Sequence, residues 1–170
     1  MSLPLLSQLA ALGAFVALMA WGAFTDFTRF IIPNRVCLAI VALYPAYVIA
    51  AGGTVDWLEA FALAGTVFGI GVVLFALRMT GGGDVKFMSA VVLWVGPPLF
   101  WPFIVVTGLV GGVMGLALAI NHRYWRTLAV RIVGLSTGAR DQALPPAMHI
   151  PYGVAIAAGG CFAALRLAMP

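Results

Sequence analysis

The sequence predicts an all-α, polytopic membrane protein, and composition is the first observation behind that prediction. Of the 170 residues, 64% are hydrophobic and 8% are charged, with a mean hydropathy of +1.10. A soluble domain carries about 25% charged residues, so a soluble fold does not account for this composition. The second observation is a series of apolar runs near the length of a membrane-spanning helix, separated by short breaks. We expect about six such spans in one integral-membrane domain, residues 1–170.

The spans are expected in order along the chain, each bounded by a polar or helix-breaking residue. They cover roughly residues 4–24, 36–51, 57–77, 84–95, 100–120 and 151–168. Pro33 cannot continue a helix, and Asn34 is expected to cap the second span. Asp84 is the expected N-cap of the fourth span, which Gly96-Pro97-Pro98 ends early.

The longest polar connection, residues 121–150, begins with an amphipathic pattern. Its apolar residues recur at helical spacing with arginines between them: Trp125, Leu128, Ala129, Ile132 and Val133, with Arg123, Arg126 and Arg131. This pattern is typical of a helix lying in the membrane interface. We therefore expect one interfacial amphipathic helix in addition to the spans, followed by a loop over residues 136–146.

The basic residues predict the orientation in the membrane. Eight of the nine belong to the connections after the first, third and fifth spans: Arg29, Arg35, Arg78, Lys86, Arg123, Arg126, Arg131 and Arg140. The positive-inside rule makes that side cytoplasmic, so both termini are expected outside a multi-pass cell (inner) membrane protein. Because these charges are spread over loops rather than clustered, no nucleic-acid partner is expected.

Two acids are expected at one depth on this basic side. Asp26 ends the first span and Asp84 begins the fourth, whereas Asp56 and Glu59 belong to the opposite side. Alone, Asp26 would be read as a charge at the headgroups paired with Arg29, and Asp84 as a helix cap. Together, two close carboxylates can share a proton, so that one acts as base and the other as acid.

The helix ends predict unequal roles for the two acids. An anion is favoured at a helix N-terminus and disfavoured at a C-terminus, so Asp84 is expected to be the anion and Asp26 the acid. Lys86 supports the charge on Asp84, while Arg29 beside Asp26 argues the other way.

Three separated motifs resemble one family. Gly81-Gly82-Gly83-Asp84 fits the Gly-x-Gly-Asp motif of intramembrane aspartyl proteases, and Val85-Lys86-Phe87 continues it as in the type IV prepilin peptidases. In that family the other catalytic aspartate is followed by an arginine and Ile-Pro-Asn, which Asp26, Arg29 and Ile32-Pro33-Asn34 match. Pro151-Tyr152-Gly153 resembles the start of the family's last span.

The resemblance implies a membrane-embedded aspartyl endopeptidase, a hydrolase, with Asp26 and Asp84 as the catalytic pair. Gly81, Gly83 and Lys86 would support the motif, with the alternative that Lys86 is a topological anchor that snorkels to the headgroups. The remaining matched residues would shape a substrate groove or end helices: Pro33, Asn34, Pro151, Tyr152 and Gly153. The implied substrate is a prepilin, with a short basic leader before an apolar helix, cut at the cytoplasmic face. The lipid bilayer and pilus-assembly proteins are the other implied partners.

The sequence departs from many members of the family in its cysteines. Paired Cys-x-x-Cys motifs are absent, and Cys37 and Cys161 lie in apolar runs. The chain resembles the short form associated with tight-adherence (Flp-type) pili or with archaeal preflagellin processing. We expect no metal site, no cofactor and no N-methylation activity.

A non-enzymatic alternative stays open from the residues alone. A small bundle with two acids at one depth could carry protons or cations, or act as a scaffold for pilus secretion. Acids in transporters usually lie near the membrane midplane, at discontinuous helices. Asp26 and Asp84 are expected at one face instead, which favours the peptidase.

Overall fold

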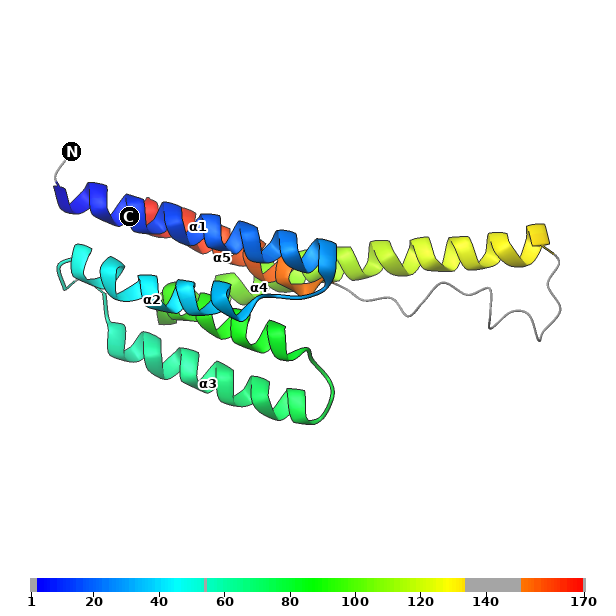
Figure 1. Ribbon diagram of the computed structural model, residues 1–170, viewed down its shortest axis with the longest axis horizontal. Helices are drawn as coiled ribbons and strands as arrows, with labels where there is room; N and C mark the ends of the chain where they lie inside the picture. The colour runs from blue at the N-terminus through cyan, green and yellow to red at the C-terminus, as the bar shows by residue number, and fades with distance from the viewer. Residues whose placement is uncertain (1–2, 54, 134–150, 170) are drawn as a thin grey trace.

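The computed structural model describes residues 3–53, 55–133 and 151–169, and the regular structure in these ranges is helical. The helices are α1 (Leu3–Arg29), α2 (Asn34–Ala50), α3 (Trp57–Ala76), α4 (Gly82–Val133) and α5 (Tyr152–Ala168). They form an elongated bundle with both chain ends at the same end (Figure 1). The all-α prediction is therefore confirmed for the described residues.

Helix α4 consists of two arms that meet at Gly96. Gly96 has φ 61° and ψ 176°, a conformation that is essentially limited to glycine, and Pro97 follows it. The first arm, residues 82–95, packs beside α1, α2 and α3, and the second arm turns back along α5 (Figure 1). The break predicted from Gly96-Pro97-Pro98 is thus confirmed.

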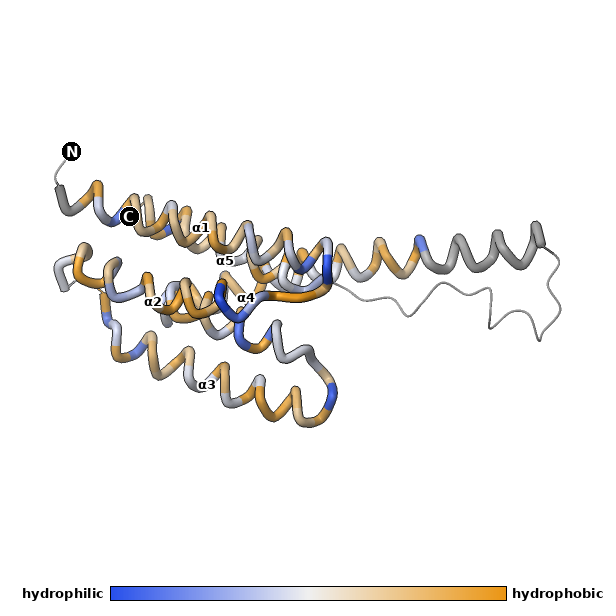
Figure 2. The backbone as a smooth tube through the Cα atoms, in the orientation of Figure 1, coloured by the Kyte–Doolittle hydropathy of each residue, from blue (hydrophilic) through white to orange (hydrophobic). Residues whose placement is uncertain are grey.

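Three helices are long and apolar enough to cross a membrane: Leu5–Arg29, Trp57–Ala76 and the stretch Gly82–Asn121 that contains the break. α2 and α5 are apolar but have 17 residues each, or about 25 Å, somewhat short of the roughly 30 Å hydrocarbon core. The structure supports a membrane protein, while the count of six spans stays a prediction. Hydrophilic residues gather at the turns after α1 and α3, at one end of the bundle (Figure 2).

The predicted interfacial helix is the end of α4 rather than a separate element. Residues 121–133 continue the second arm without interruption, because no glycine or proline stands between residues 116 and 133 to stop the helix. The helical periodicity of this segment is confirmed, but its separation from the fifth predicted span is not. The loop predicted over residues 136–146 lies outside the described residues.

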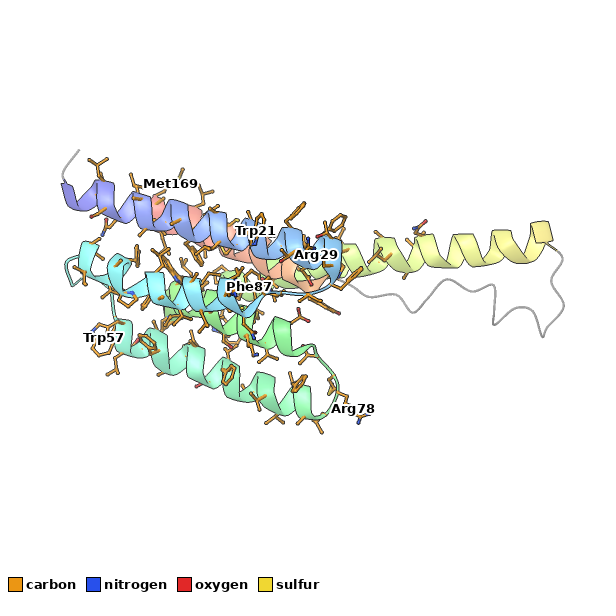
Figure 3. All side chains as sticks on the ribbon, viewed as in Figure 1. Trp21, Arg29, Trp57, Arg78, Phe87 and Met169 are labelled. Atoms are coloured by element: carbon orange, nitrogen blue, oxygen red, sulfur yellow. The ribbon has the colours of Figure 1, made fainter. Side chains whose placement is uncertain are left out.

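The core is built around the first arm of α4. The Trp94 ring stacks on Phe15 of α1 at 4.3 Å between centroids, and its Nε1 donates to the Ile40 carbonyl at 3.0 Å. Phe87 is fully buried against Gly22, where a Cβ would lie 2.9 Å from the Phe87 ring. In Figure 3, Phe87 lies inside the bundle while Trp21 projects from its surface. Glycines at such crossings let the helices approach closely, which is how membrane helices gain packing energy.

Candidate active site

A cavity of about 980 Å³ opens at the end of the bundle that carries the turns after α1 and α3. Its walls come from α1, α3, both arms of α4 and α5, and it contains both predicted catalytic acids, Asp26 and Asp84. Two acids that are 58 residues apart in sequence (84 minus 26) therefore share one chamber.

Asp26 lies in the last turn of α1 and is buried, with 6% of its surface exposed. Its Oδ2 accepts a hydrogen bond of 2.7 Å from the backbone N–H of Gly153, in the first turn of α5. The α5 N-cap, Pro151, forms no side-chain capping bond. Asp26 therefore supplies from α1 the acceptor that a capping side chain would normally provide.

This contact explains why residue 153 is glycine. A Cβ at Gly153 would lie 2.8 Å from Oδ2 of Asp26 and 3.0 Å from both its Cγ and its Cβ. Three atoms of one buried side chain thus exclude any larger residue. Tyr152, which begins α5, is exposed and lines the cavity beside this contact.

Asp84 lies at the start of α4, but it is not the N-cap that the sequence suggested. The helix begins at Gly82, so Asp84 is its third residue, and its carboxylate faces the backbone of Gly81. An acid at this position reaches back to the N–H that precedes the helix, as in a capping box. A Cβ at Gly81 would lie 2.9 Å from Oδ2 of Asp84, whereas one at Gly83 would make an ordinary 3.6 Å contact with Ile32.

These contacts remove the expected asymmetry between the acids. Asp84 lies in the first turn of α4, and Asp26, although it ends α1, faces the first turn of α5. Both carboxylates thus face the positive end of a helix dipole. The positions of Asp84 and Asp26 at helix ends therefore do not determine which of them is the anion and which is the acid.

Lys86 and Asn34 lie outside this cavity. Lys86 Nζ donates to Asn34 Oδ1 at 3.2 Å, and both side chains line a second hollow. The prediction that Asn34 caps α2 is wrong, because Pro33 is the N-cap residue and no side chain caps the helix. The bond to Lys86 instead links the start of α2 to the start of α4.

Of the residues predicted to form a substrate groove, Tyr152 is the one that lines the cavity. Pro151 is the N-cap of α5, and Gly153, in its first turn, donates a hydrogen bond to Asp26. Pro33 is the N-cap of α2. Ile32, directly before Pro33, does line the cavity. The other four predicted groove residues therefore lie outside the cavity lining.

The cavity also contains residues that the sequence did not single out. Thr107, on the second arm of α4, lines the cavity, and its hydroxyl is buried against Gly159 of α5 with no hydrogen-bond partner among the described residues. Phe30 and Arg78 follow α1 and α3 with φ values of 52° and 59°. A lone threonine in an apolar run carries no signal in the sequence, and positive φ at non-glycine residues cannot be read from it. In the described part of the chain, no group of three or more His, Cys, Asp or Glu side chains could hold a metal ion.

Comparison with known proteins identifies the family. The sequence model of the type IV leader peptidase family matches residues 13–120, a range that includes Asp26, Ile32-Pro33-Asn34 and residues 81–86. Pro151-Tyr152-Gly153 lies beyond the matched range. No curated protein and no solved structure matches the chain. With more than half of its length matched, and with its apolar helices, the chain is a membrane protein that belongs to the type IV leader peptidase family and hence is a prepilin-type peptidase.

Proposed function

We propose that this protein is an aspartyl endopeptidase that removes the leader peptide from prepilin-like substrates, with Asp26 and Asp84 activating a water molecule. The observation that carries the proposal is the shared cavity, which Asp26 and Asp84 both line. No other described acid lines that cavity, since Asp56 and Glu59 stand at the start of α3.

In the proposed reaction, a water molecule lies between the two carboxyl groups, one ionised and one protonated. The ionised carboxylate takes a proton from the water. The oxygen of this water attacks the carbonyl carbon of the scissile peptide. The protonated partner gives its proton to the carbonyl oxygen or to the leaving nitrogen as the C–N bond breaks. Positioned acid and base groups of this kind contribute about 10²–10⁴-fold to the rate.

The buried hydroxyl of Thr107 is a candidate donor to the substrate or to the attacking water. It lines the same cavity and has no partner in the described part of the chain, and buried hydroxyls are normally satisfied. Because the oxygen is buried against Gly159 in the structure, the side chain would have to rotate for a substrate carbonyl or a water to satisfy it. Such a fixed donor stabilises charge that develops on oxygen in the transition state.

The proposed topology has six spans, namely the helices α1, α2, α3 and α5 and the two arms of α4. The cavity end would face the cytoplasm, because Arg29 ends α1, Arg35 is in the first turn of α2 and Arg78 follows α3, and the chain ends would face outside. A prepilin could then present its extended leader at the surface while its apolar helix stays in the bilayer. Irregular backbone at membrane depth needs shelter from lipid, which a cavity provides. The likeness to the short form extends the proposal to Flp-type prepilins.

Co-expression with a candidate prepilin tests the proposal. We expect Asp26→Asn and Asp84→Asn each to lower leader removal by about 10²–10⁴-fold, followed as a shift on a gel and by sequencing of the new N-terminus. Asp56→Asn is the matched control, since this exposed acid forms no side-chain cap on α3 and lies outside the cavity. Equal processing by all three variants at equal membrane levels would instead favour a transporter or a secretion scaffold.

A further inference from the structure

The second hollow is an apolar groove of about 510 Å³ between α2 and α3, with the first arm of α4 as its floor. Each helix contributes four residues with the same spacing. These are positions 34, 37, 38 and 41 of α2, positions 61, 64, 65 and 68 of α3, and positions 86, 89, 90 and 93 of α4. This i, i+3, i+4, i+7 pattern is one face of a helix. The groove therefore runs along the helix axes for about two turns, or roughly 10 Å.

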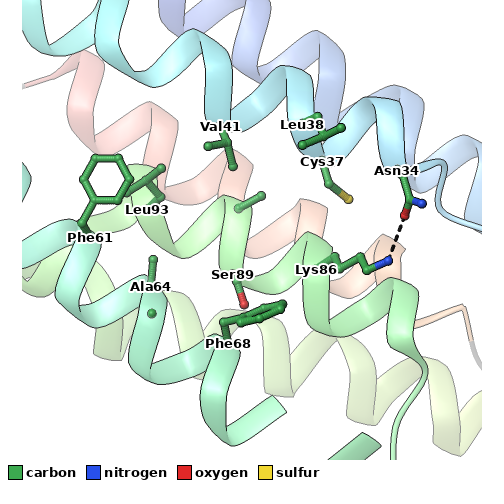
Figure 4. A pocket seen from close by; sticks show the side chains of 12 residues that line it. Asn34, Cys37, Leu38, Val41, Phe61, Ala64, Phe68, Lys86, Ser89 and Leu93 are labelled. Carbon is green, nitrogen blue, oxygen red and sulfur yellow. Dashed lines mark hydrogen bonds between the residues drawn. The ribbon is translucent and has the colours of Figure 1, made fainter. Parts of the chain in front are cut away.

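The polar and apolar parts of this groove are separated along its length. Lys86 and Asn34 form one end, joined by their hydrogen bond, while Phe61 and Leu93 lie toward the other end (Figure 4). Leu38, Val41 and Phe68 complete a mainly hydrocarbon wall. A ligand that matches the groove has a polar group at one end and a hydrocarbon chain behind it.

The charge of Lys86 is not neutralised by the described residues. Its ammonium is exposed, and its hydrogen-bond partner in the described structure is the neutral amide oxygen of Asn34, with no ion pair to a carboxylate there. A cation at the edge of the hydrocarbon region attracts the anionic groups of lipids by about 1 kcal/mol. A ligand that binds at this end of the groove is therefore expected to be anionic.

We propose that this groove binds one anionic phospholipid, with its headgroup phosphate on Lys86 and one acyl chain between α2 and α3. The polar and apolar parts of the groove follow each other as the headgroup and acyl chain of a lipid do. The Lys86 ammonium lies at the end of the bundle, and the apolar wall extends inward from it. A substrate bound at the catalytic cavity is a less suitable occupant of this groove, because Lys86 and Asp84 lie on different sides of α4. Lys86 and Asp84 are two residues apart and so project about 160° apart around α4. The bound lipid would hold α2 and α3 against the arm whose first turn carries Asp84.

Native mass spectrometry of the purified full chain in detergent tests the proposal, with dioleoyl-phosphatidylglycerol and dioleoyl-phosphatidylcholine as probes. We expect one tightly retained phosphatidylglycerol and at least about fivefold weaker retention of phosphatidylcholine. Lys86→Gln should remove this preference between the two lipids. Gly65→Leu should weaken the binding of both, because Gly65 lines the groove, has open space beyond its Cα, and a leucine there would occupy the acyl-chain path.

Gly69→Leu is the matched control. Gly69 lies one turn further along α3, has the same open space and lines neither hollow. Equal lipid retention in the Gly65 and Gly69 variants would overturn the proposal, as would a lack of preference for phosphatidylglycerol in the wild type. So would a result in which Lys86→Gln and Gly65→Leu weaken prepilin binding in lipid-free detergent but leave lipid retention unchanged, since the groove would then be a substrate surface. Lipid retention is measured without cleavage, so a failure of the lipid proposal can be distinguished from a failure of the catalytic proposal.

Discussion

The starts of α4 and α5 each contact an aspartate carboxylate, but the two contacts differ in how far apart their residues are in sequence. At each, a glycine faces an aspartate carboxylate: a Cβ at Gly81 would lie 2.9 Å from Oδ2 of Asp84, and one at Gly153 would lie 2.8 Å from Oδ2 of Asp26. The first contact joins residues three apart in one turn. The second joins residues 127 apart, on different helices. One acid is therefore held by local sequence and the other by the tertiary fold.

The two contacts also differ in what could move to relieve a clash. At Gly81 the one side-chain atom nearer than 3.5 Å is an oxygen at the far end of Asp84, which can rotate. At Gly153 the near atoms include the Cβ and Cγ of Asp26, which are fixed by the buried end of α1. We therefore expect the tertiary contact to be the less tolerant of the two.

The largest effect is expected for Gly153→Ala. The added methyl group must push α5 away from α1 or displace Asp26, and it breaks the 2.7 Å hydrogen bond that positions the carboxylate. A misplacement of about 1 Å at a catalytic group can cost about 100-fold in rate, so we expect at least that loss in prepilin processing. Initial cleavage rates at equal enzyme levels measure it.

Gly112→Ala is the control for this variant. Gly112 also lies in a helix of the bundle, but a Cβ there would meet nothing within 4 Å. We expect near wild-type rates. Similar rates for the two alanine variants would show that the contact between Gly153 and Asp26 does not position the acid.

A smaller effect is expected for Gly81→Ala, with Gly83→Ala as its matched partner. The methyl group at residue 81 forces the Asp84 side chain away from its preferred rotamer, which costs about 0.5–1.5 kcal/mol, or roughly 2- to 10-fold in rate. At Gly83 the 3.6 Å approach to Ile32 leaves room for a methyl group, so we expect a change within about twofold. A larger loss at Gly83 than at Gly81 would contradict this order and would point to substrate contact with the backbone of residue 83.

The smallest effect is expected at the end of α3, where the chain enters the turn that leads to Gly81. Arg78 adopts φ 59°, with its N–H bonded to Phe75 and that of Met79 bonded to Leu74, the pattern of a Schellman motif. Glycine is preferred at this position, because a Cβ costs about 1 kcal/mol in the left-handed region. We expect Arg78→Gly to unfold about 2–4 °C higher than Arg78→Ala, measured by thermal denaturation in detergent. Equal melting temperatures would mean that the turn relaxes out of this conformation.

The sequence could predict the features that depend on neighbouring residues. Gly96-Pro97-Pro98 breaks α4 wherever the helix lies, because the residues themselves restrict the backbone. Helix caps depend on more than the neighbouring residues. Asn34 and Asp84 each have a side chain suited to capping, but Asn34 bonds to Lys86, 52 residues away, and Asp84 lies two residues inside its helix. Sequence propensity shows which residues are able to cap a helix. Tertiary contacts decide which of them do so.

By itself, the sequence determined that this is a helical membrane protein of the type IV leader peptidase family and named the two acids as candidates. Composition and the motifs around Asp26 and Asp84 suffice for that, because the cost of burying charge in hydrocarbon leaves few reasons to keep an acid there. The tertiary structure alone decided that Asp26 receives the N–H of Gly153, that Lys86 turns away to a separate groove, and that Thr107 lines the cavity. These facts depend on how helices distant in sequence pack, and no local pattern encodes that packing.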